Sequence, residues 1–150
     1  MMDTVKTVNR VILRIAGPND LPDIFRLVDS YEDGFMMDSD TLKNHLRDMV
    51  YIHGVIIAEY NGVVIGGVAG YALPCMFTEE ILYSCMMFYV KKQYRRLTKS
   101  FVKELEMFLL PTNAKRLIFS TLATPDGYKL QHFFRSLGYT ELETHFAKRF

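Results

Sequence analysis

The sequence predicts one α/β (α+β) domain in which helices cover a mixed central sheet. Apolar runs of strand length alternate along the chain with segments whose apolar residues recur at helical spacing. A chain of 150 residues with 49% hydrophobic content has the size of one domain and can build a substantial core. No linker or repeat breaks the alternation. We therefore expect residues 1–150 to form a single domain with about six to seven strands and about four helices, the first ten residues preceding the first element.

A strand and two helices open the chain. Val11–Ala16 is predicted as a strand, and a helix begins after it near Asn19 or Asp20. A second helix is capped by Asp38 or Ser39. The expected apolar faces are Leu21, Ile24, Phe25, Val28 and Tyr31 in the first helix, and Leu42, Leu46 and Met49 in the second.

A β-hairpin follows these helices. Asn61-Gly62 separates the apolar segments Val55–Tyr60 and Val63–Leu73. Because both turn residues tolerate positive φ, this pair is the strongest short-range signal for a hairpin. Three glycines in the second strand leave room for close approach of another backbone or for a bulge, namely Gly66, Gly67 and Gly70.

The centre of the predicted sheet is the strand Ile81–Val90. It is apolar on both faces, which is typical of a strand buried in the middle of a sheet. A basic turn follows it directly and contains no acidic residue before Glu104. Cations oppose the dipole at a helix N-terminus unless that end binds an anion, so we interpret this turn as an anion-binding cradle. Its cations are Lys91, Lys92, Arg95, Arg96, Lys99 and Lys103.

The basic turn leads into a helix that ends before Pro111, and Arg116–Leu122 forms the next strand. Because a helix connects the two strands, Arg116–Leu122 is expected to lie parallel to Ile81–Val90. Parallel neighbours of this kind diverge and form a ligand crevice at their carboxyl ends, here beside Val90. The inward face of the connecting helix consists of Phe101, Leu105, Phe108 and Leu109.

A helix and a strand close the chain. The helix begins at Pro125-Asp126 and ends at Gly138, which forms its C-terminal cap. Tyr139–Phe150 is predicted as the final strand. The inward face of the helix consists of Leu130, Phe133, Phe134 and Leu137.

Charge and cysteine content narrow the functional classes. The net charge is +1, and six of the 18 Lys and Arg residues lie in the basic turn, a pattern that suits a small polyanion better than a nucleic-acid surface. Cys75 and Cys85 are too few for a disulfide framework, and neither cysteines nor histidines have metal-ligand spacing. No apolar run spans a membrane, and Met1–Lys6 lacks the apolar core of a signal peptide. We expect a reducing cytoplasm and no metal.

The basic turn resembles a known motif. Val90-Lys-Lys-Gln-Tyr-Arg-Arg-Leu-Thr-Lys-Ser-Phe is similar to motif A of the GNAT (Gcn5-related) N-acetyltransferases, Val-x-Pro-x-Tyr-Arg continuing as Arg-x-x-Gly-x-Gly. Arg95 matches the motif arginine, while Thr98 and Ser100 stand at the glycine positions. Phe133–Tyr139 resembles the end of the family's motif B, Tyr-x-x-x-Gly-Phe.

This resemblance implies an acetyl-CoA-dependent N-acetyltransferase. From about Val11 onward, the order of elements fits the family's three-layer fold, whose central strands splay at the acetyl-CoA site. Such enzymes transfer acetyl directly to an amine in a ternary complex without a metal, and residues 32–37 would form a loop on the acceptor side. The implied acetyl-CoA-binding residues are Phe88, Tyr89, Val90, Arg95, Arg96, Leu97, Thr98, Lys99, Ser100, Leu130 and Phe134.

A narrower resemblance concerns small acetyltransferase-like proteins encoded by bacteriophages. The segments Phe88-Tyr-Val-x-x-x-Tyr-Arg-Arg and Leu142–Lys148 are similar to theirs. This similarity implies a phage or prophage origin and the host cytoplasm as the place of action.

Two departures from the motifs bear on catalysis. Phe134 stands where the family commonly has the tyrosine that protonates the departing thiolate, and phenylalanine has no proton to give. Thr98 and Ser100 add β-carbons to the loop that wraps the pyrophosphate, although their hydroxyls can donate to phosphate oxygens. The candidates for the base that deprotonates the amine are Glu79, Glu80 and Tyr83. We prefer Glu80, because the ordinary pKa of Tyr83, about 10, would have to fall considerably.

Plainer roles and other functions stay open. Glu80 also suits a solvated strand end, Tyr83 a core aromatic, and Cys85 either an acyl-transfer nucleophile or a buried apolar residue. The main alternative function is a domain that has lost catalysis and binds CoA or a protein. A nucleic-acid binder using the basic turn would show steeply salt-dependent affinity, but the near-neutral net charge argues against it. The edge strands of such a sheet favour a homodimer.

Overall fold

The computed structural model describes residues 9–31 and 38–150. These residues form two compact units, one within residues 1–120 and the other within residues 121–150, and each is described by itself. The loop expected at residues 32–37 lies outside the described residues. The expectation of one domain over residues 1–150 stays a prediction.

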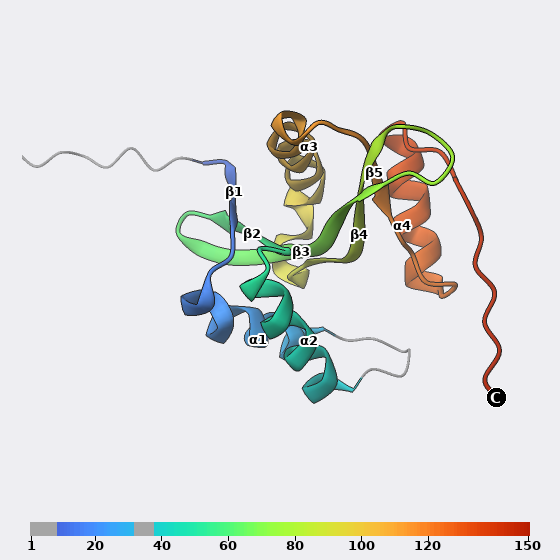
Figure 1. Ribbon diagram of the computed structural model, residues 1–150. Coiled ribbons are helices and arrows are strands. Elements are labelled where there is room, and N and C mark those ends of the chain that lie inside the picture. Colours follow the sequence, from blue (N-terminus) through green and yellow to red (C-terminus); the bar gives the residue numbers. More distant parts are fainter. Residues whose placement is uncertain (1–8, 32–37) are drawn as a thin grey trace, which may run out of the picture. The chain divides into compact units, whose positions relative to one another are not determined.

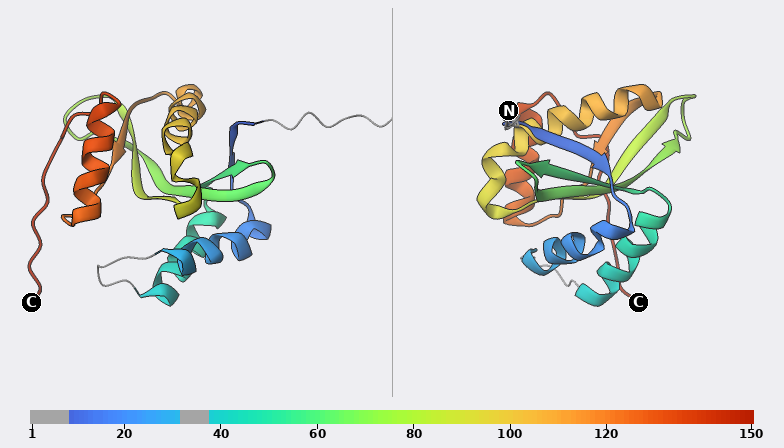
Figure 2. Two further views of the ribbon diagram at one scale, coloured as in Figure 1. Left: turned by 180° about the vertical axis from the view of Figure 1, so that it is seen from behind. Right: turned by 90° about the vertical axis from the view of Figure 1, so that its left-hand side faces the viewer.

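A five-stranded sheet organises the first unit. Its strands lie in the order β1-β2-β3-β4-β5, antiparallel from β1 to β4, with β5 parallel to β4. Helices α1 and α2 cover one face of this sheet and α3 covers the other (Figures 1 and 2). The elements are β1 (Val11–Ile15), the 3-10 turn η1 (Pro18–Asp20), α1 (Leu21–Ser30), α2 (Ser39–Tyr51), β2 (Val55–Tyr60), β3 (Val63–Pro74), β4 (Ile81–Val90), η2 (Lys92–Leu97), α3 (Thr98–Leu109), η3 (Leu110–Thr112) and β5 (Ala114–Phe119).

The helices bury the apolar faces that their spacing predicts. Ile24 and Val28 of α1 and Leu46 of α2 are buried in one core cluster, and Phe101 and Leu105 of α3 are buried in a second cluster on the opposite face of the sheet. Burying each of these large side chains stabilises the fold by about 1.5 to 3 kcal/mol relative to leaving it exposed. The two clusters therefore account for the two helical layers.

Local sequence signals fix several element ends. The carboxylate of Asp38 accepts hydrogen bonds from the backbone amides of Asp40 and Thr41, both at 3.1 Å, so the predicted cap of α2 is confirmed. Asn61 and Gly62 have φ values of 50° and 76°, which confirms the predicted hairpin between β2 and β3.

The glycines of β3 allow its neighbours to approach closely. A β-carbon on Gly66 would clash with the carbonyl oxygen of Tyr89, and one on Gly70 would clash with the carbonyl oxygen of Ser84. The predicted close approach of backbones is therefore confirmed at both glycines, and both contacts are with β4.

Strand β5 begins two residues before the predicted start at Arg116 and ends at Phe119, and it is parallel to β4 as predicted. Helix α3 gives way to the tight turn η3 at Leu110, in agreement with the end predicted before Pro111. Up to β5 the order of helices and strands follows from the sequence, while the ends of β5 differ from the prediction by two to three residues.

Arg14 joins β1 to the turn before α1 and to β2. Its guanidinium donates to the two carboxylate oxygens of Asp20 at 2.7 and 2.8 Å and to the carboxylate of Glu59 at 2.8 Å. The backbone amide of Gly17 also donates to Asp20, at 2.8 Å. The side chain of Arg14 holds the pKa of the Asp20 carboxyl below its usual range, so the charge of this 8% exposed residue is matched within the fold.

The second unit contains α4 (Pro125–Ser136). The Thr124 hydroxyl oxygen accepts a hydrogen bond of 3.1 Å from the amide of Gly127, and Gly138 closes the helix at a φ of 91°, as predicted. The predicted strand Tyr139–Phe150 is wrong, because residues 139–150 form neither helix nor strand. A strand requires a neighbour for its backbone groups, and the alternation of side chains does not supply one.

The described part of the chain has five strands rather than about six to seven. None of the described helices is long and apolar enough to cross a membrane.

Candidate functional site

The sheet opens along β4. The parallel ladder between β4 and β5 runs from Ile81 to Cys85 on β4 and stops at the pair Cys85–Phe119, although β4 continues to Val90. The second half of β4, residues 86–90, therefore extends past the end of its parallel neighbour. This is the divergence of strands that the sequence predicted beside Val90, and within the described residues of the first unit it leaves no strand paired with this edge of β4 at residues 86–90.

A β-bulge lies where this divergence begins. Ala69 of β3 pairs with Met87 and the next residue, Gly70, pairs with Cys85, so Met86 stands opposite no residue of β3. A bulge leaves one residue outside the regular ladder and turns the strand locally. It also shifts the alternation of faces. Residues three positions apart in a regular strand lie on opposite faces, but Cys85 and Phe88 both belong to the core cluster on the α3 side.

The side chains predicted to bind acetyl-CoA on β4 form the walls on either side of this edge. On the α3 side, the Phe88 ring lies 5.1 Å from that of Phe101 and 5.2 Å from that of Phe119, and Val90 is buried. On the opposite face, the Tyr89 ring packs edge-to-face against Tyr31 at 5.2 Å. These three side chains are engaged in packing, so a ligand along this edge would meet the backbone of β4.

The basic turn follows the open edge. Its six cations are Lys91, Lys92, Arg95, Arg96, Lys99 and Lys103, and within the described residues none of them forms an ion pair with a carboxylate. Arg95, Arg96 and Lys99 are exposed. Arg96 donates to the carbonyl of Gln93 at 3.1 Å and lies over the ring of Tyr94. A concentration of unmatched positive charge at this place favours an anionic ligand.

The turn is wound more tightly than the predicted cradle. Residues 92–97 form the 3-10 helix η2, which continues into α3, and the backbone amide of Thr98 donates to the carbonyl of Arg95. The Thr98 hydroxyl donates to the same carbonyl at 2.7 Å rather than pointing its proton outward for a phosphate. Leu97 packs against the core on the α3 side, whereas Ser100 is exposed. The predicted role of Thr98 as a phosphate donor therefore requires its hydroxyl to leave the Arg95 carbonyl.

The two predicted base residues lie away from the bulge. Glu80 immediately precedes β4. Since a β-strand rises by about 3.3 Å per residue, Glu80 lies about 20 Å from Met86 along the strand. Its Oε2 lies 2.9 Å from Arg116 Nε. Tyr83 is 8% exposed in the α3-side core, and burial raises its pKa to about 12. Burial disfavours proton transfer by the Tyr83 hydroxyl, and the predicted role of Glu80 as the base stays a prediction.

Leu130 and Phe134 belong to the second unit, on α4. Phe134 is buried, with its ring 5.5 Å from those of Phe133 and Tyr139. Their predicted contact with acetyl-CoA stays a prediction.

The two cysteines differ in environment. Cys85 is buried in the α3-side core, and burial raises the pKa of its thiol, which disfavours a role as a nucleophile. Cys75 lies in the connection from β3 to β4, where a hydrogen bond with Thr78 lowers the pKa of its thiol. Within the described residues, no group of three or more His, Cys, Asp or Glu side chains has the geometry of a metal site.

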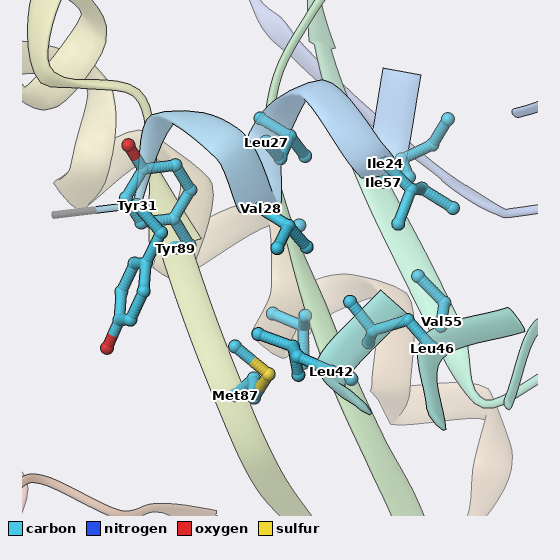
Figure 3. A pocket seen from close by; sticks show the side chains of 13 residues that line it. Ile24, Leu27, Val28, Tyr31, Leu42, Leu46, Val55, Ile57, Met87 and Tyr89 are labelled. Carbon is cyan, nitrogen blue, oxygen red and sulfur yellow. The ribbon is translucent and has the colours of Figure 1, made fainter. Parts of the chain in front are cut away.

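Sequence reasoning missed a cavity of about 50 Å³ on the other face of the sheet. It lies between α1, α2 and strands β2 to β4 (Figure 3). No local pattern announces it, because its lining comes from five separate elements. The lining residues are Ile24, Leu27, Val28, Tyr31, Leu42, Leu46, Val55, Ile57, Gly67, Val68, Ala69, Met87 and Tyr89.

Solved acetyltransferases share this architecture. A ribosomal-protein-alanine N-acetyltransferase from Brucella melitensis biovar Abortus 2308 matches with a TM-score of 0.73 and 19% identity, over 93% of this chain and 99% of that chain. A GNAT family acetyltransferase from Staphylococcus aureus matches with a TM-score of 0.71 and 16% identity, over 94% and 99%. An aminoglycoside acetyltransferase from an uncultured soil metagenomic sample, in complex with trehalose, matches with a TM-score of 0.67 and 19% identity, over 97% and 99%.

No family model matches the sequence, and no curated protein does. At identities below one fifth, the likeness to solved structures concerns the fold and not the substrates. The expectation of a mixed sheet covered by helices, drawn from the order of elements and the motif around Arg95, is confirmed at this level. The chain has the fold of the GNAT acetyltransferases.

Proposed function

We propose that this protein transfers the acetyl group of acetyl-CoA to a primary amine. The proposal rests on three features that follow one another along β4. They are the end of the β4–β5 ladder at Cys85, the bulge at Met86, and the basic turn after Val90. An open strand edge accepts an extended, amide-bearing chain such as pantetheine by backbone hydrogen bonding. The cations beyond it suit the pyrophosphate and the 3′-phosphate of the same molecule.

In this proposal the transfer is direct. The lone pair of the amine nitrogen attacks the thioester carbonyl, an N–C bond forms, and the C–S bond breaks to release the thiolate of CoA. The proton lost by the amine and the proton gained by the thiolate pass through water. A backbone amide beside Met86 stabilises the developing oxyanion, a contribution that preorganised donors commonly make to acyl transfer.

The amine loses its proton to water rather than to Glu80 or Tyr83. Glu80 is paired with Arg116 and lies beyond the far end of the β5 ladder, and Tyr83 holds its proton more firmly than a free tyrosine. Primary amines are mostly protonated at neutral pH, so the rate should rise with pH toward the pKa of the free amine.

The names of the structural neighbours suggest acceptors with amino groups, since one acts on ribosomal protein alanine and another on aminoglycosides. We extend only the amine to this chain. An origin in a bacteriophage genome, a place of action in the host cytoplasm and a homodimer also belong to the proposal, and they rest on the sequence resemblance and on the edge strands.

A second candidate is a protein that keeps the fold, binds CoA or a protein partner, and no longer catalyses. Two observations favour it. Phe134 stands at the position of the motif tyrosine, and the tight turn at Thr98 uses a hydroxyl that could otherwise meet a phosphate. Direct binding and thiol release distinguish the two candidates.

The deciding experiment is calorimetric titration of the protein with acetyl-CoA and with CoA, followed by a thiol-release assay with a panel of primary amines. Arg95→Glu should weaken binding of both ligands about tenfold to a hundredfold, because it removes a charge-assisted contact with the phosphates and replaces it with a negative charge. Arg10→Glu, at an exposed cation outside the turn, serves as the matched control and should leave binding unchanged. Binding with thiol release supports the enzyme, binding without release supports the second candidate, and absence of binding contradicts the acetyltransferase.

A further inference from the structure

The cavity beneath α1 and α2 has a uniform chemical character. None of its thirteen lining residues carries a charge, and the hydroxyls of Tyr31 and Tyr89 are the polar groups among the lining side chains. The two tyrosines lie together at one side of the cavity, while aliphatic side chains from α1, α2 and β2 surround the rest (Figure 3). An occupant would therefore be apolar over most of its surface.

The Tyr89 hydroxyl contributes to the shape of this cavity. It donates to the backbone carbonyl of Ser30 at 2.9 Å, and it lies 3.1 Å from the Ser30 hydroxyl. The Tyr89 ring is also held against Tyr31. These contacts fix the tyrosine side of the cavity in one arrangement, so the space is preformed.

The cavity adjoins the part of β4 that carries the bulge. Met87 and Tyr89 line it, and Met87 directly follows the bulge residue Met86. Ala69, which pairs with Met87 across the β3–β4 ladder, lines it as well. A group held in the cavity thus lies against the same stretch of strand at which we place the acetyl group.

We infer that this cavity receives a short, branched aliphatic group of the acceptor, and that the acceptor is a small primary amine with a single positive charge. This inference rests on the proposed function. A cavity of about 50 Å³ is a third of the size of cavities of about 150 Å³ that admit benzene, so it has room for a short aliphatic group and not for a ring. The ammonium group stays at the edge, because burying it without a partner is unfavourable.

The same chemistry argues against polycationic acceptors. Polyamines and aminoglycosides carry several ammonium groups, each of which requires a carboxylate or another acceptor when it leaves water. Among the residues that the structure describes, the lining offers no carboxylate. We therefore do not expect an aminoglycoside as the acceptor of this protein, although its fold is like that of an aminoglycoside acetyltransferase.

The test has two arms, and the first measures turnover. At saturating acetyl-CoA, kcat/KM for the amine should rise along the series ethylamine, propylamine, isobutylamine and isopentylamine. The expected rise is about fourfold for each added carbon, because burying one methylene group contributes about 0.8 kcal/mol. 1,4-Diaminobutane and an aminoglycoside should show no such gain. Equal kcat/KM along the series, or a preference for the diamine, would overturn the inference while leaving the proposed function intact.

The second arm measures binding without chemistry. Isopentylamine is titrated in the absence of acetyl-CoA and followed by ligand-observed NMR. Ala69→Val adds two carbons to the cavity wall and should abolish binding, whereas Val63→Ile adds one carbon at an exposed position of the same strand and should not. Both variants are checked for folding by their thermal unfolding.

The two arms separate the two hypotheses. Binding that Ala69→Val abolishes supports the cavity as the aliphatic site even where no amine is acetylated, and in that case the proposed transfer is what fails. Absence of isopentylamine binding, or binding unchanged in Ala69→Val, identifies the space as a packing void only and overturns the inference.

Discussion

The phenolic hydroxyl of Tyr89 donates a 2.9 Å hydrogen bond to the backbone carbonyl of Ser30, which is the last residue of α1. The two residues are 59 positions apart in the chain. The bond supplies a partner for a carbonyl at the helix end that has none within the helix. It thereby attaches α1 to the half of β4 that carries the open edge.

Tyr89→Phe should lower the free energy of unfolding by about 0.5 to 1.5 kcal/mol, the usual net contribution of one hydrogen bond. Urea unfolding followed by circular dichroism measures this loss. Tyr51→Phe, which removes a hydroxyl from an exposed tyrosine at the end of α2, is the matched control and should have no effect. Equal stability of Tyr89→Phe and the wild type would show that solvent replaces the bond.

Deletion of Met86 should leave a folded protein that has lost acetyl transfer. Met86 has no counterpart on β3, so its removal joins Cys85 to Met87 in a regular ladder and keeps every other pair. Met87 is identical, so deletion of either methionine gives the same chain. Loss of the preorganised amide at the bulge should reduce kcat about 100- to 1,000-fold.

The control for this deletion is Met86→Ala, which keeps the extra backbone residue and removes the side chain. It should fold and retain activity, because the side chain of Met86 is 60% exposed. Thermal unfolding and thiol release report on the two properties separately. An active deletion variant would contradict the role we assign to the bulge.

Thr98→Gly should strengthen acetyl-CoA binding about fivefold, which corresponds to one additional hydrogen bond of about 1 kcal/mol. Glycine removes both the hydroxyl that ties the turn to the Arg95 carbonyl and the β-carbon that narrows the loop. Thr98→Ala removes the hydroxyl but keeps the β-carbon, so it separates the two effects. Calorimetry measures both affinities, and weaker binding of Thr98→Gly would show that the tight turn is the binding conformation.

Asp20→Asn should lower the free energy of unfolding at pH 7 by about 1.5 to 3 kcal/mol, because it replaces charge-assisted hydrogen bonds from Arg14. Arg14 lowers the pKa of Asp20 in the folded protein, so the folded state binds fewer protons than the unfolded state. The carboxylate therefore stabilises the fold above the unfolded pKa of about 3.9, and this contribution is lost as the pH falls below it.

Denaturant unfolding at a series of pH values measures this dependence. The difference between the wild type and Asp20→Asn should shrink as the pH falls from 5 toward 2. Asp23→Asn, at an exposed pair with Arg26 on α1, is the control and should change stability by less than about 1 kcal/mol at any pH. A difference that persists at low pH would assign the effect to packing instead of charge.

Features with a local physical cause could be predicted from the sequence. The hairpin at Asn61-Gly62 depends on two residues that tolerate positive φ, and the start of α2 depends on the carboxylate of Asp38. The boundaries of β4 match the prediction because the charged residues Glu80 and Lys91 flank its apolar run. The positive charge of the turn after β4 is visible in the sequence, while its role as an anion-binding cradle stays a prediction.

The site itself depends on relationships between distant segments. The bulge at Met86 is invisible in a sequence of apolar residues, and it alters which face each later residue of β4 occupies. The cavity is lined by five elements, and no single one of them carries a signal for it. The wrong strand at Tyr139–Phe150 has the same origin, because a side-chain pattern does not reveal whether a pairing partner exists.

The unmatched residue in β4 also bears on the history of the gene. Met86 lengthens the central strand by one residue that the β3–β4 ladder does not require. A gene released from selection for acyl transfer could lose this codon and still encode the fold, and the resulting strand would be more regular. If the proposed transfer depends on the bulge, the length of β4 in related sequences distinguishes those that keep the amide beside Met86 from those that have lost it.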